Sequence, residues 1–266
     1  MSEYPIISTA RVGDGTTVKI EYHKMLYSTS ELAKKYASEG YPDRYAVFAE
    51  AQGSSKITGT RLGDGEFEKG IFISLILRPS VFPSQAGLLG HLAAVGLISA
   101  LDEYSAKPLG LGWVSDIYCG GARIGGSSIE GKLDSYSSYE YLIINVAIRL
   151  DNECFPPRLT DMIRKVFGED YQSVPMIIAK SVLGKLMLAY SAIRNPAKYI
   201  DEYRRRFILA GEKIKYIDGD KKRPCRVVDI NRDSGSLVIE LKGERQIEIK
   251  SPSQVIMPKR LETEHR

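Results

Sequence analysis

The sequence predicts an α/β (α+β) fold: a mixed β-sheet domain with packed helices, followed by a small SH3-like β-barrel. Over the first 208 residues, apolar runs typical of buried strands alternate with segments of helical spacing. From Gly211 the pattern changes to short alternating segments separated by turns that contain Gly or Asp, at 213–217, 226–230, 236–241 and 245–249. We therefore expect two domains, 1–208 and 209–266.

The elements of the first domain are predicted from their periodicity. Strands are expected where residues alternate or form short apolar runs, at 18–22, 45–52, 71–78 and 141–147. Helices are expected where apolar residues recur at helical spacing, at 31–40, 84–104, 159–166, 176–191 and 197–207. Ser28, Thr29 or Ser30 can cap the first of these helices.

Composition limits the class of protein. The chain is 43% hydrophobic, ample for one good core, and its net charge of +4 gives no argument for nucleic acid or a membrane surface. Three Cys are no disulfide framework, so Cys119, Cys154 and Cys225 are expected as free thiols in a reducing cytosol. The three His are too scattered to predict a metal site. No apolar run reaches about 18 residues and the N-terminus lacks a secretion signal, so a cytoplasmic protein is expected.

The most informative stretch is 110–131, which reads as strand, Gly-Gly turn, strand and short loop. It contains Trp113, the single Trp of the chain, and Asp116 three residues later. Arg123 follows the turn, and Gly125-Gly126 leaves room for a close approach to the backbone. A ring, a charge and bare backbone on one hairpin fit a small-molecule site. By itself, a buried Trp in a hairpin is more often part of a core than a ligand platform, and a Gly-Gly pair is more often just a turn.

This hairpin resembles the biotin protein ligases of the biotin/lipoate ligase family. Their signature is a K-W-P-N-D run, a short turn, R-K-x-x-G and a strand that ends in Glu. The register holds here from Trp113 through Asp116 to Gly126 and Glu130 without a gap. The resemblance implies that Arg123 stands where the family has its catalytic Lys, which neutralises charge around the carboxylate and the α-phosphate. The Lys, Pro and Asn of the first run are replaced by Gly112, Val114 and Ser115.

The resemblance also implies where biotin would bind. The family's D-S-T-N run, whose polar groups approach the biotin head group, is Tyr27-Ser28-Thr29-Ser30 here. The family strand that ends in A-E-x-Q matches residues 49–52. The implied biotin-binding residues are Ser28, Thr29, Ser30, Gln52, Trp113, Gly125 and Gly126.

The nucleotide-binding signals are mixed. Asn145 matches the first Asn of the family's G-I-G-I-N-V-N strand, although both flanking Gly positions are filled. The family's G-R-G-R-R-G-R loop is only partly echoed in residues 53–70, where Asp64, Glu66 and Glu68 add negative charge. A polar connection without phosphate-binding function fits this segment equally well. The implied nucleotide- or phosphate-binding residues are Lys56, Arg61, Asp116 and Asn145, and no metal-binding residue is predicted.

The resemblance implies ATP-dependent activation of biotin to biotinoyl-5'-AMP, with Mg²⁺, and transfer to a lysine of a biotin carboxyl carrier domain. The chain leaves no room for the N-terminal DNA-binding domain that some of these ligases carry, so no DNA partner is expected, and without a long apolar run no membrane partner is expected. Because ligases of this kind often pair through sheet edges, the resemblance implies a possible homodimer. The alternative is a protein that binds a small acid or its adenylate without activating it, because Arg123 replaces the catalytic Lys of the family. A lipoyl or octanoyl transferase ranks lower, because no His lies at useful spacing from Cys119 or Cys154.

Overall fold

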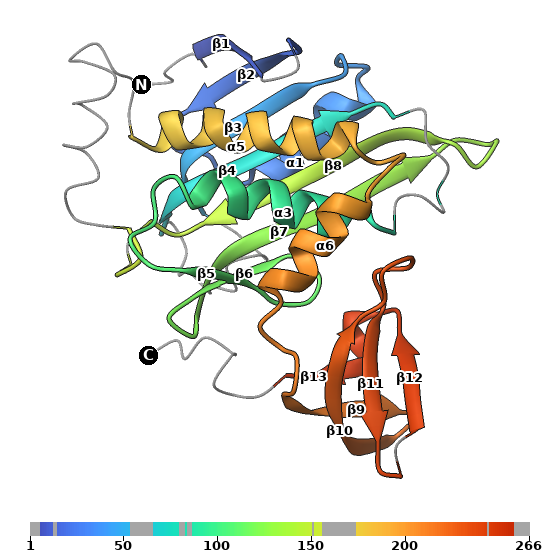
Figure 1. Ribbon diagram of the computed structural model, residues 1–266. Coiled ribbons are helices and arrows are strands. Elements are labelled where there is room, and N and C mark those ends of the chain that lie inside the picture. Colours follow the sequence, from blue (N-terminus) through green and yellow to red (C-terminus); the bar gives the residue numbers. More distant parts are fainter. Residues whose placement is uncertain are drawn as a thin grey trace.

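The computed structural model describes residues 6–12, 15–53, 66–79, 83, 87–150, 152–155, 174–243 and 245–257. They form two sheets, one of eight strands and one of five (Figure 1). The strands of the large sheet, in chain order, are β1 (Ile6–Arg11), β2 (Thr17–His23), β3 (Tyr45–Gln52), β4 (Glu68–Leu77), β5 (Leu109–Leu111), β6 (Asp116–Cys119), β7 (Ala122–Leu133) and β8 (Tyr139–Ile148).

The large sheet is mixed, as predicted. Its strand order is β1-β2-β3-β4-β8-β7-β6-β5. Among the described strands, β2 and β3 run parallel, and the other neighbouring pairs of this sheet run antiparallel. The predicted strands at 18–22, 45–52, 71–78 and 141–147 are therefore confirmed as the inner part of this sheet.

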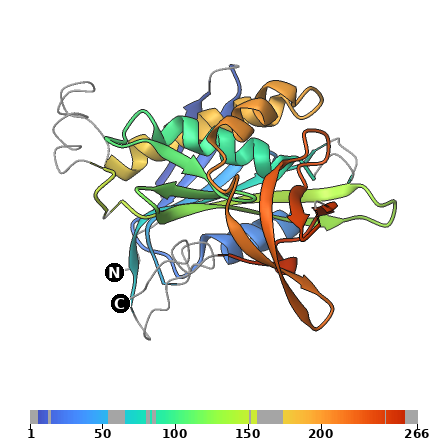
Figure 2. The ribbon, with the colours of Figure 1, turned by 60° about the horizontal axis from the view of Figure 1, so that its bottom comes forward.

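Helices cover both faces of the large sheet. Helices α3 (Leu89–Leu101), α5 (Val174–Ser191) and α6 (Ala197–Arg206) lie on one face, and α1 (Thr29–Ser38) lies on the other (Figures 1 and 2). The predicted helix at 84–104 is shorter, because α3 ends at Leu101 and its described residues begin at Leu89. The predicted helix at 159–166 lies outside the described residues.

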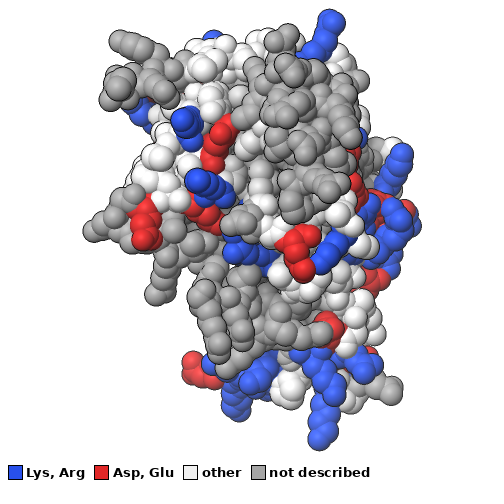
Figure 3. Space-filling view, turned by 90° about the vertical axis from the view of Figure 1, so that its left-hand side faces the viewer, with Lys and Arg blue, Asp and Glu red and all other residues white. Residues whose placement is uncertain are grey.

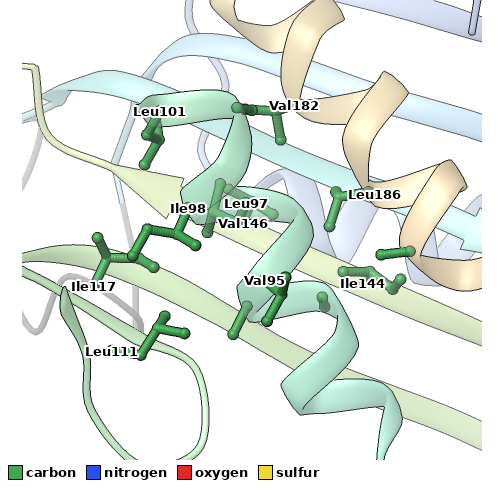
Figure 4. Close-up of a cluster of buried hydrophobic side chains, with 14 of the residues drawn as sticks. Val95, Leu97, Ile98, Leu101, Leu111, Ile117, Ile144, Val146, Val182 and Leu186 are labelled. Atoms are coloured by element: carbon green, nitrogen blue, oxygen red, sulfur yellow. The ribbon is translucent and has the colours of Figure 1, made fainter. Parts of the chain in front are cut away.

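The main hydrophobic core fills the space between the sheet and α3 and α5. Alternate residues of the strands face these helices, as the period of two in a strand requires. Figure 4 shows part of this core: Val95, Leu97, Ile98 and Leu101 of α3, Val182 and Leu186 of α5, and Leu111, Ile117, Ile144 and Val146 of the sheet.

One helix of the described residues, α5, is long and apolar enough to cross a membrane by length and composition alone. The sequence had not indicated it, because its 18 residues include charged side chains at Lys180 and Lys185. In the structure α5 packs against α3 and the sheet, and its residues Val182, Leu183 and Leu186 are fully buried there. This is the packing of a core helix.

The second sheet forms the C-terminal β-unit that the sequence predicts as a barrel. It contains β9 (Lys213–Asp218), β10 (Lys221–Ile230), β11 (Leu237–Leu241), β12 (Arg245–Ile249) and β13 (Val255–Ile256), with the short helix η1 (Pro252–Gln254) before the last strand. Its order is β12-β11-β10-β9-β13, so the final strand, which the sequence analysis missed, pairs with the first. A two-residue strand is too short to be predicted from alternation.

The structure corrects the expectation that all three Cys are free thiols. Cys119 at the end of β6 and Cys154 form a disulfide, with Cα atoms 6.3 Å apart. Ala106 N–H, in the loop between α3 and β5, donates to the Cys154 carbonyl oxygen at 2.8 Å and holds the segment that carries Cys154 against this loop. Cys225 is a free, buried cysteine.

Candidate functional site

The sheet face that carries α1 brings polar side chains from distant segments into one row. Strand register places Ser74 of β4 opposite Asn145 of β8, and Asn145 opposite Ser128 of β7. Residues paired directly across strands point to the same face. Ser74 and Asn145 are both buried, so each needs a hydrogen-bond partner.

The partners form one continuous network from α1 to β7. Thr29 Oγ1 and the Thr29 backbone N–H both donate to Gln52 Oε1 at 2.9 Å. Ser74 Oγ lies 3.0 Å from Thr29 Oγ1 and 2.7 Å from Asn145 Oδ1, and it donates to one of them at a time because a hydroxyl carries one proton. Asn145 Nδ2 donates to Glu130 Oε1 at 3.1 Å. We call this set, Thr29, Gln52, Ser74, Asn145 and Glu130, the polar network.

Helix α1 supplies two further contacts to Glu130. Ser30 Oγ donates to Glu130 Oε1 at 3.3 Å, and Lys34 Nζ lies 2.7 Å from Glu130 Oε2. The hydrogen bond to Glu130 raises the pKa of Lys34, so this side chain is a cation at neutral pH. Ser28 is the N-cap of the same helix, and its side chain accepts from the Glu31 N–H at 3.2 Å. The N-cap residue Ser28 is therefore the chain neighbour of Thr29, the member of the polar network that α1 contributes.

Next to the polar network lies a row of small and apolar residues. Register places Ala49, Phe72, Ala147, Gly126 and Asp116 opposite one another on successive strands β3, β4, β8, β7 and β6. The three apolar side chains are buried, and Leu26 packs against them. With about 3.4 Å per residue and about 4.8 Å between strands, this row puts Asp116 roughly 12 Å from Asn145.

Arg123 meets Asp116 at the end of this row. Arg123 Nη2 lies 2.7 Å and Nε 2.9 Å from Asp116 Oδ1. The Arg123 side chain is 19% exposed, so it does not extend freely into solvent. Burial raises the pKa of the Asp116 carboxyl, while the Arg123 guanidinium acts in the opposite direction. The pair thus places a partly buried cation at the β6 end of this row, which runs alongside the polar network.

Trp113 belongs neither to the polar network nor to the row of small residues beside it. It belongs to the main core, and its indole Nε1–H donates to the carbonyl oxygen of Gly235 in the turn before β11, at 3.3 Å. His91 of α3 and Tyr203 of α6 pack against each other beside that turn, with ring centroids 4.6 Å apart. In the structure, Trp113 therefore joins the two sheets, which the sequence analysis did not foresee. Its predicted contact with biotin stays a prediction.

The two hairpin glycines are required by neighbouring backbone. A Cβ at Gly125, whose φ is +155°, would lie 2.1 Å from the Ala147 carbonyl oxygen. A Cβ at Gly126 would lie 2.5 Å from the Ser115 carbonyl oxygen. At these two positions a side chain would meet the backbone of β8 and of Ser115, just before β6. The predicted contact of both glycines with biotin stays a prediction. Lys56 and Arg61 lie outside the described residues.

The site contains residues that the sequence analysis did not select. Ser74 joins the α1 and β8 parts of the polar network, and Lys34 reaches it from the second turn of α1. Glu130 was noted only as the end of the signature strand. A Ser inside the apolar run 71–77 was the available signal for Ser74, because a buried hydroxyl needs a partner. The described residues contain no group of three or more His, Cys, Asp or Glu side chains that could hold a metal ion.

Comparison with solved structures defines the class of fold. Biotin protein ligase from Aquifex aeolicus in complex with biotin and ATP superposes with a TM-score of 0.64 at 19% identity, over 89% of this chain and 97% of that chain. Its apo structure gives 0.63 at 18% identity, over 90% and 98%. A biotin protein ligase-like protein of unknown function from Silicibacter sp. gives 0.62 at 13% identity, over 90% and 97%. The chain has the fold of the biotin protein ligases.

Sequence comparison gives particular relatives. The bifunctional ligase/repressor BirA of Bacillus subtilis is 27% identical over 143 residues, which are 53% of this chain and 44% of that protein. BirA of Bacillus spizizenii is 25% identical over 142 residues, with the same coverage. The match thus spans less than half the length of these curated relatives. No model of a known protein family matches the chain. The predicted resemblance to biotin protein ligases is confirmed at this level.

Proposed function

We propose that this chain is a biotin protein ligase: it activates biotin with MgATP and transfers it to a lysine of a carrier domain. The main support for the proposal is the arrangement of residues on the face of the large sheet that carries α1. A polar network and a row of small apolar residues lie side by side there, and the row ends at Asp116, the partner of Arg123, roughly 12 Å from Asn145. A molecule with a polar head group, an alkyl chain and a terminal carboxylate has the same order of parts.

In this proposal the polar network holds the head group. Thr29 and Ser74 have hydroxyls, Gln52 and Asn145 have amides, and Glu130 is an acceptor. A ureido group, with two N–H donors and one carbonyl acceptor, can exchange hydrogen bonds with such a set. The alkyl chain would lie along Ala49, Phe72 and Ala147, where Leu26 packs in the structure.

Arg123 would stabilise charge in both steps. In the first, a biotin carboxylate oxygen attacks the α-phosphorus of ATP, the bond to the β-phosphate bridging oxygen breaks, and pyrophosphate leaves. In the second, the lysine amine attacks the acyl carbon, AMP leaves, an amide forms and a proton is released. Asp116 uses the Nε and Nη2 atoms of Arg123, so Nη1 is able to donate to the phosphate. Arg is planar and forked, so it clamps oxygens rather than acting as the point charge of a Lys.

The direct test is incorporation of labelled biotin into a biotin carboxyl carrier domain, with MgATP, by the purified chain. The proposal predicts label on the carrier that depends on ATP and is absent when the acceptor lysine is replaced by Arg. No label at stoichiometric enzyme concentration would contradict it. The same sample shows whether biotinoyl-5'-AMP forms in the absence of the carrier.

One observation favours the alternative of a binding protein without activation chemistry. The charge of Arg123 is already balanced by Asp116, which weakens the attraction for a phosphate. Calorimetry separates the two functions. A binding protein takes up biotin, lipoate or octanoate with an affinity that ATP does not change, whereas a ligase shows tighter, slowly reversible binding once the adenylate forms. The domain division at residues 208 and 209 is part of the same proposal. The cytoplasmic location expected from the sequence stays a prediction, since a disulfide such as Cys119–Cys154 is uncommon in a reducing compartment.

A further inference from the structure

The hairpin formed by β9 and β10 concentrates positive charge. Residues 213–226 contain six Lys or Arg and two Asp, a net charge of +4. This equals the formal net charge of the whole chain, so the remaining residues are balanced overall. Figure 3 shows Lys and Arg side chains gathered over the lower end of the molecule, where the second sheet lies.

Strand register places four of these cations on one surface. Ile214 and Cys225 pair across the hairpin and are buried, so they face the interior of the second sheet. The neighbouring pairs, which point the opposite way, are Lys213 with Arg226, Lys215 with Pro224, and Ile217 with Lys222. We call Lys213, Lys215, Lys222 and Arg226 the basic face; all four residues are exposed.

Little negative charge neutralises the basic face. Within the described residues, none of its four cations forms an ion pair, whereas Arg223 on the same hairpin pairs with Asp218 at 2.9 Å. Asp220 lies in the turn, and Glu240 is opposite Arg226 on β11 without forming an ion pair with it. Four like charges on two adjacent strands repel one another. An anionic surface placed against them relieves this repulsion.

The position of the second sheet relates the basic face to the candidate site. In Figure 2 the second sheet reaches past the large sheet on the side where α1 lies. The polar network lies on that side, because Thr29 and Ser30 belong to the first turn of α1. Trp113 and Gly235 tie the second sheet to the hairpin β6–β7 that carries Arg123. We therefore expect a large molecule that binds at this face to lie close to the second sheet as well.

We propose that the basic face of the β9–β10 hairpin docks an acidic surface of the protein that accepts the acyl group. This inference rests on the proposed function, since it assigns a docking surface to the second substrate of that reaction. Charge complementarity of this kind steers encounter and raises the association rate more than it raises affinity. The reactive lysine of the acceptor can then reach the candidate site while the acidic surface of the acceptor stays bound to the second sheet.

A protein fits this surface better than nucleic acid does. The chain has a net charge of only +4, whereas a nucleic-acid-binding domain is typically strongly basic over a whole face. Single-stranded nucleic acid also requires exposed aromatic rings for stacking, and the basic face carries Ile217 and Pro224 between its cations. Short-range charge pairing around a small apolar contact is typical of a transient protein interface.

The test is the transfer reaction of the double variant Lys215→Glu/Lys222→Glu with a biotin carboxyl carrier domain as acceptor. The control is Arg194→Glu/Lys198→Glu, which makes the same change of net charge at exposed positions beside and on α6. We expect the KM for the carrier to rise about tenfold in the first variant and to stay within twofold in the control. The rise should shrink as salt is increased from 50 to 300 mM, because screening weakens exposed charges.

Two further measurements distinguish failure of the docking proposal from failure of the proposed function. Biotin-dependent exchange of pyrophosphate into ATP does not involve the carrier, so it should be unchanged in both variants, and its absence in the wild-type chain would refute the proposed function instead. A carrier with surface Asp and Glu changed to Asn and Gln should lose the difference between wild type and variant. An unchanged KM, or a variant defect confined to binding of a 20-base-pair DNA duplex measured by fluorescence anisotropy, would overturn the docking proposal.

Discussion

Arg123 and Asp116, seven residues apart on the two strands of one hairpin, form an ion pair with Nη2 2.7 Å from Oδ1. Strand register puts Asp116 in line with Gly126 and Ala147, on the sheet face that carries the polar network. The pair therefore lies on the face where Thr29 and Gln52, two of the predicted biotin-binding residues, meet. Its electrostatics can be tested without a substrate.

Removing the guanidinium should raise the pKa of Asp116 further. Burial already raises this pKa above 3.8, and Arg123 is the group that opposes the shift through charge and hydrogen bonding. In Arg123→Gln only the burial effect remains, so the carboxyl should protonate at a higher pH than in the wild type. Titration of the Asp116 carboxyl carbon by NMR measures both values. An equal or lower pKa in Arg123→Gln would show that the two groups do not interact in solution.

Ser74→Ala should weaken ligand binding and lower stability together. The Ser74 side chain is fully buried and joins Thr29 to Asn145. Without it, the Asn145 Oδ1 atom loses a donor at a cost of about 1–3 kcal/mol. We expect the Kd for biotin, measured by calorimetry, to rise about tenfold, with unfolding at lower denaturant concentration. Ser128→Ala, at the next position of the same register row, is the control and should change neither quantity by much.

His91 should make stability depend on pH below neutrality. Burial lowers the pKa of His91 to about 4, against an ordinary value of about 6.5. The unfolded state therefore binds a proton more readily, so the stabilisation is complete above about pH 6.5 and is lost as the pH falls toward 4. Between pH 7 and pH 5 the loss attributable to His91 should be about 2 kcal/mol.

The measurement is the free energy of unfolding of wild type and His91→Phe at both pH values. Phe keeps the ring contact with Tyr203 and has no proton to gain. The wild type should lose about 2 kcal/mol more than the variant between the two pH values. Parallel losses in the two proteins would mean that His91 is accessible to protons in the folded state.

The Cys119–Cys154 disulfide should stabilise the fold against unfolding. It closes a loop of 35 residues, for which the chain-entropy estimate is about 3–4 kcal/mol. Adding a reductant, or changing both residues to Ser, should lower the midpoint of denaturation, and the double variant should no longer respond to reductant. A Cys225→Ser variant should respond to reductant as the wild type does. Two free thiols in the purified protein at these positions would contradict the disulfide.

Much of the fold could be predicted from the sequence because it depends on local pattern. The alternation at 18–22 and the apolar run at 71–78 are strands of the large sheet, and the change of pattern near Gly211 precedes the second sheet. The hydroxyl-rich segment before α1 was visible as a helix cap, and Ser28 is the N-cap. Each of these features is decided within about ten neighbouring residues.

The rest depends on contacts between distant segments. Ser74 and Asn145 become neighbours only through the register of β4 and β8, 71 residues apart. Trp113 meets Gly235 across 122 residues, which no local pattern shows. The disulfide likewise requires that the end of β6 and Cys154 come together in the fold. Residue types at these positions were readable, but their partners were not.

The role of Arg123 is tested most directly by biotin-dependent exchange of labelled pyrophosphate into ATP, measured for wild type, Arg123→Ala and Arg123→Lys. We predict exchange in the wild type and a loss of at least about 100-fold in Arg123→Ala, as expected when a charge-stabilising group is removed. Arg123→Lys, which restores the family's residue, should retain measurable exchange. Equal exchange in wild type and Arg123→Ala would contradict the assignment of Arg123 to the reacting phosphate.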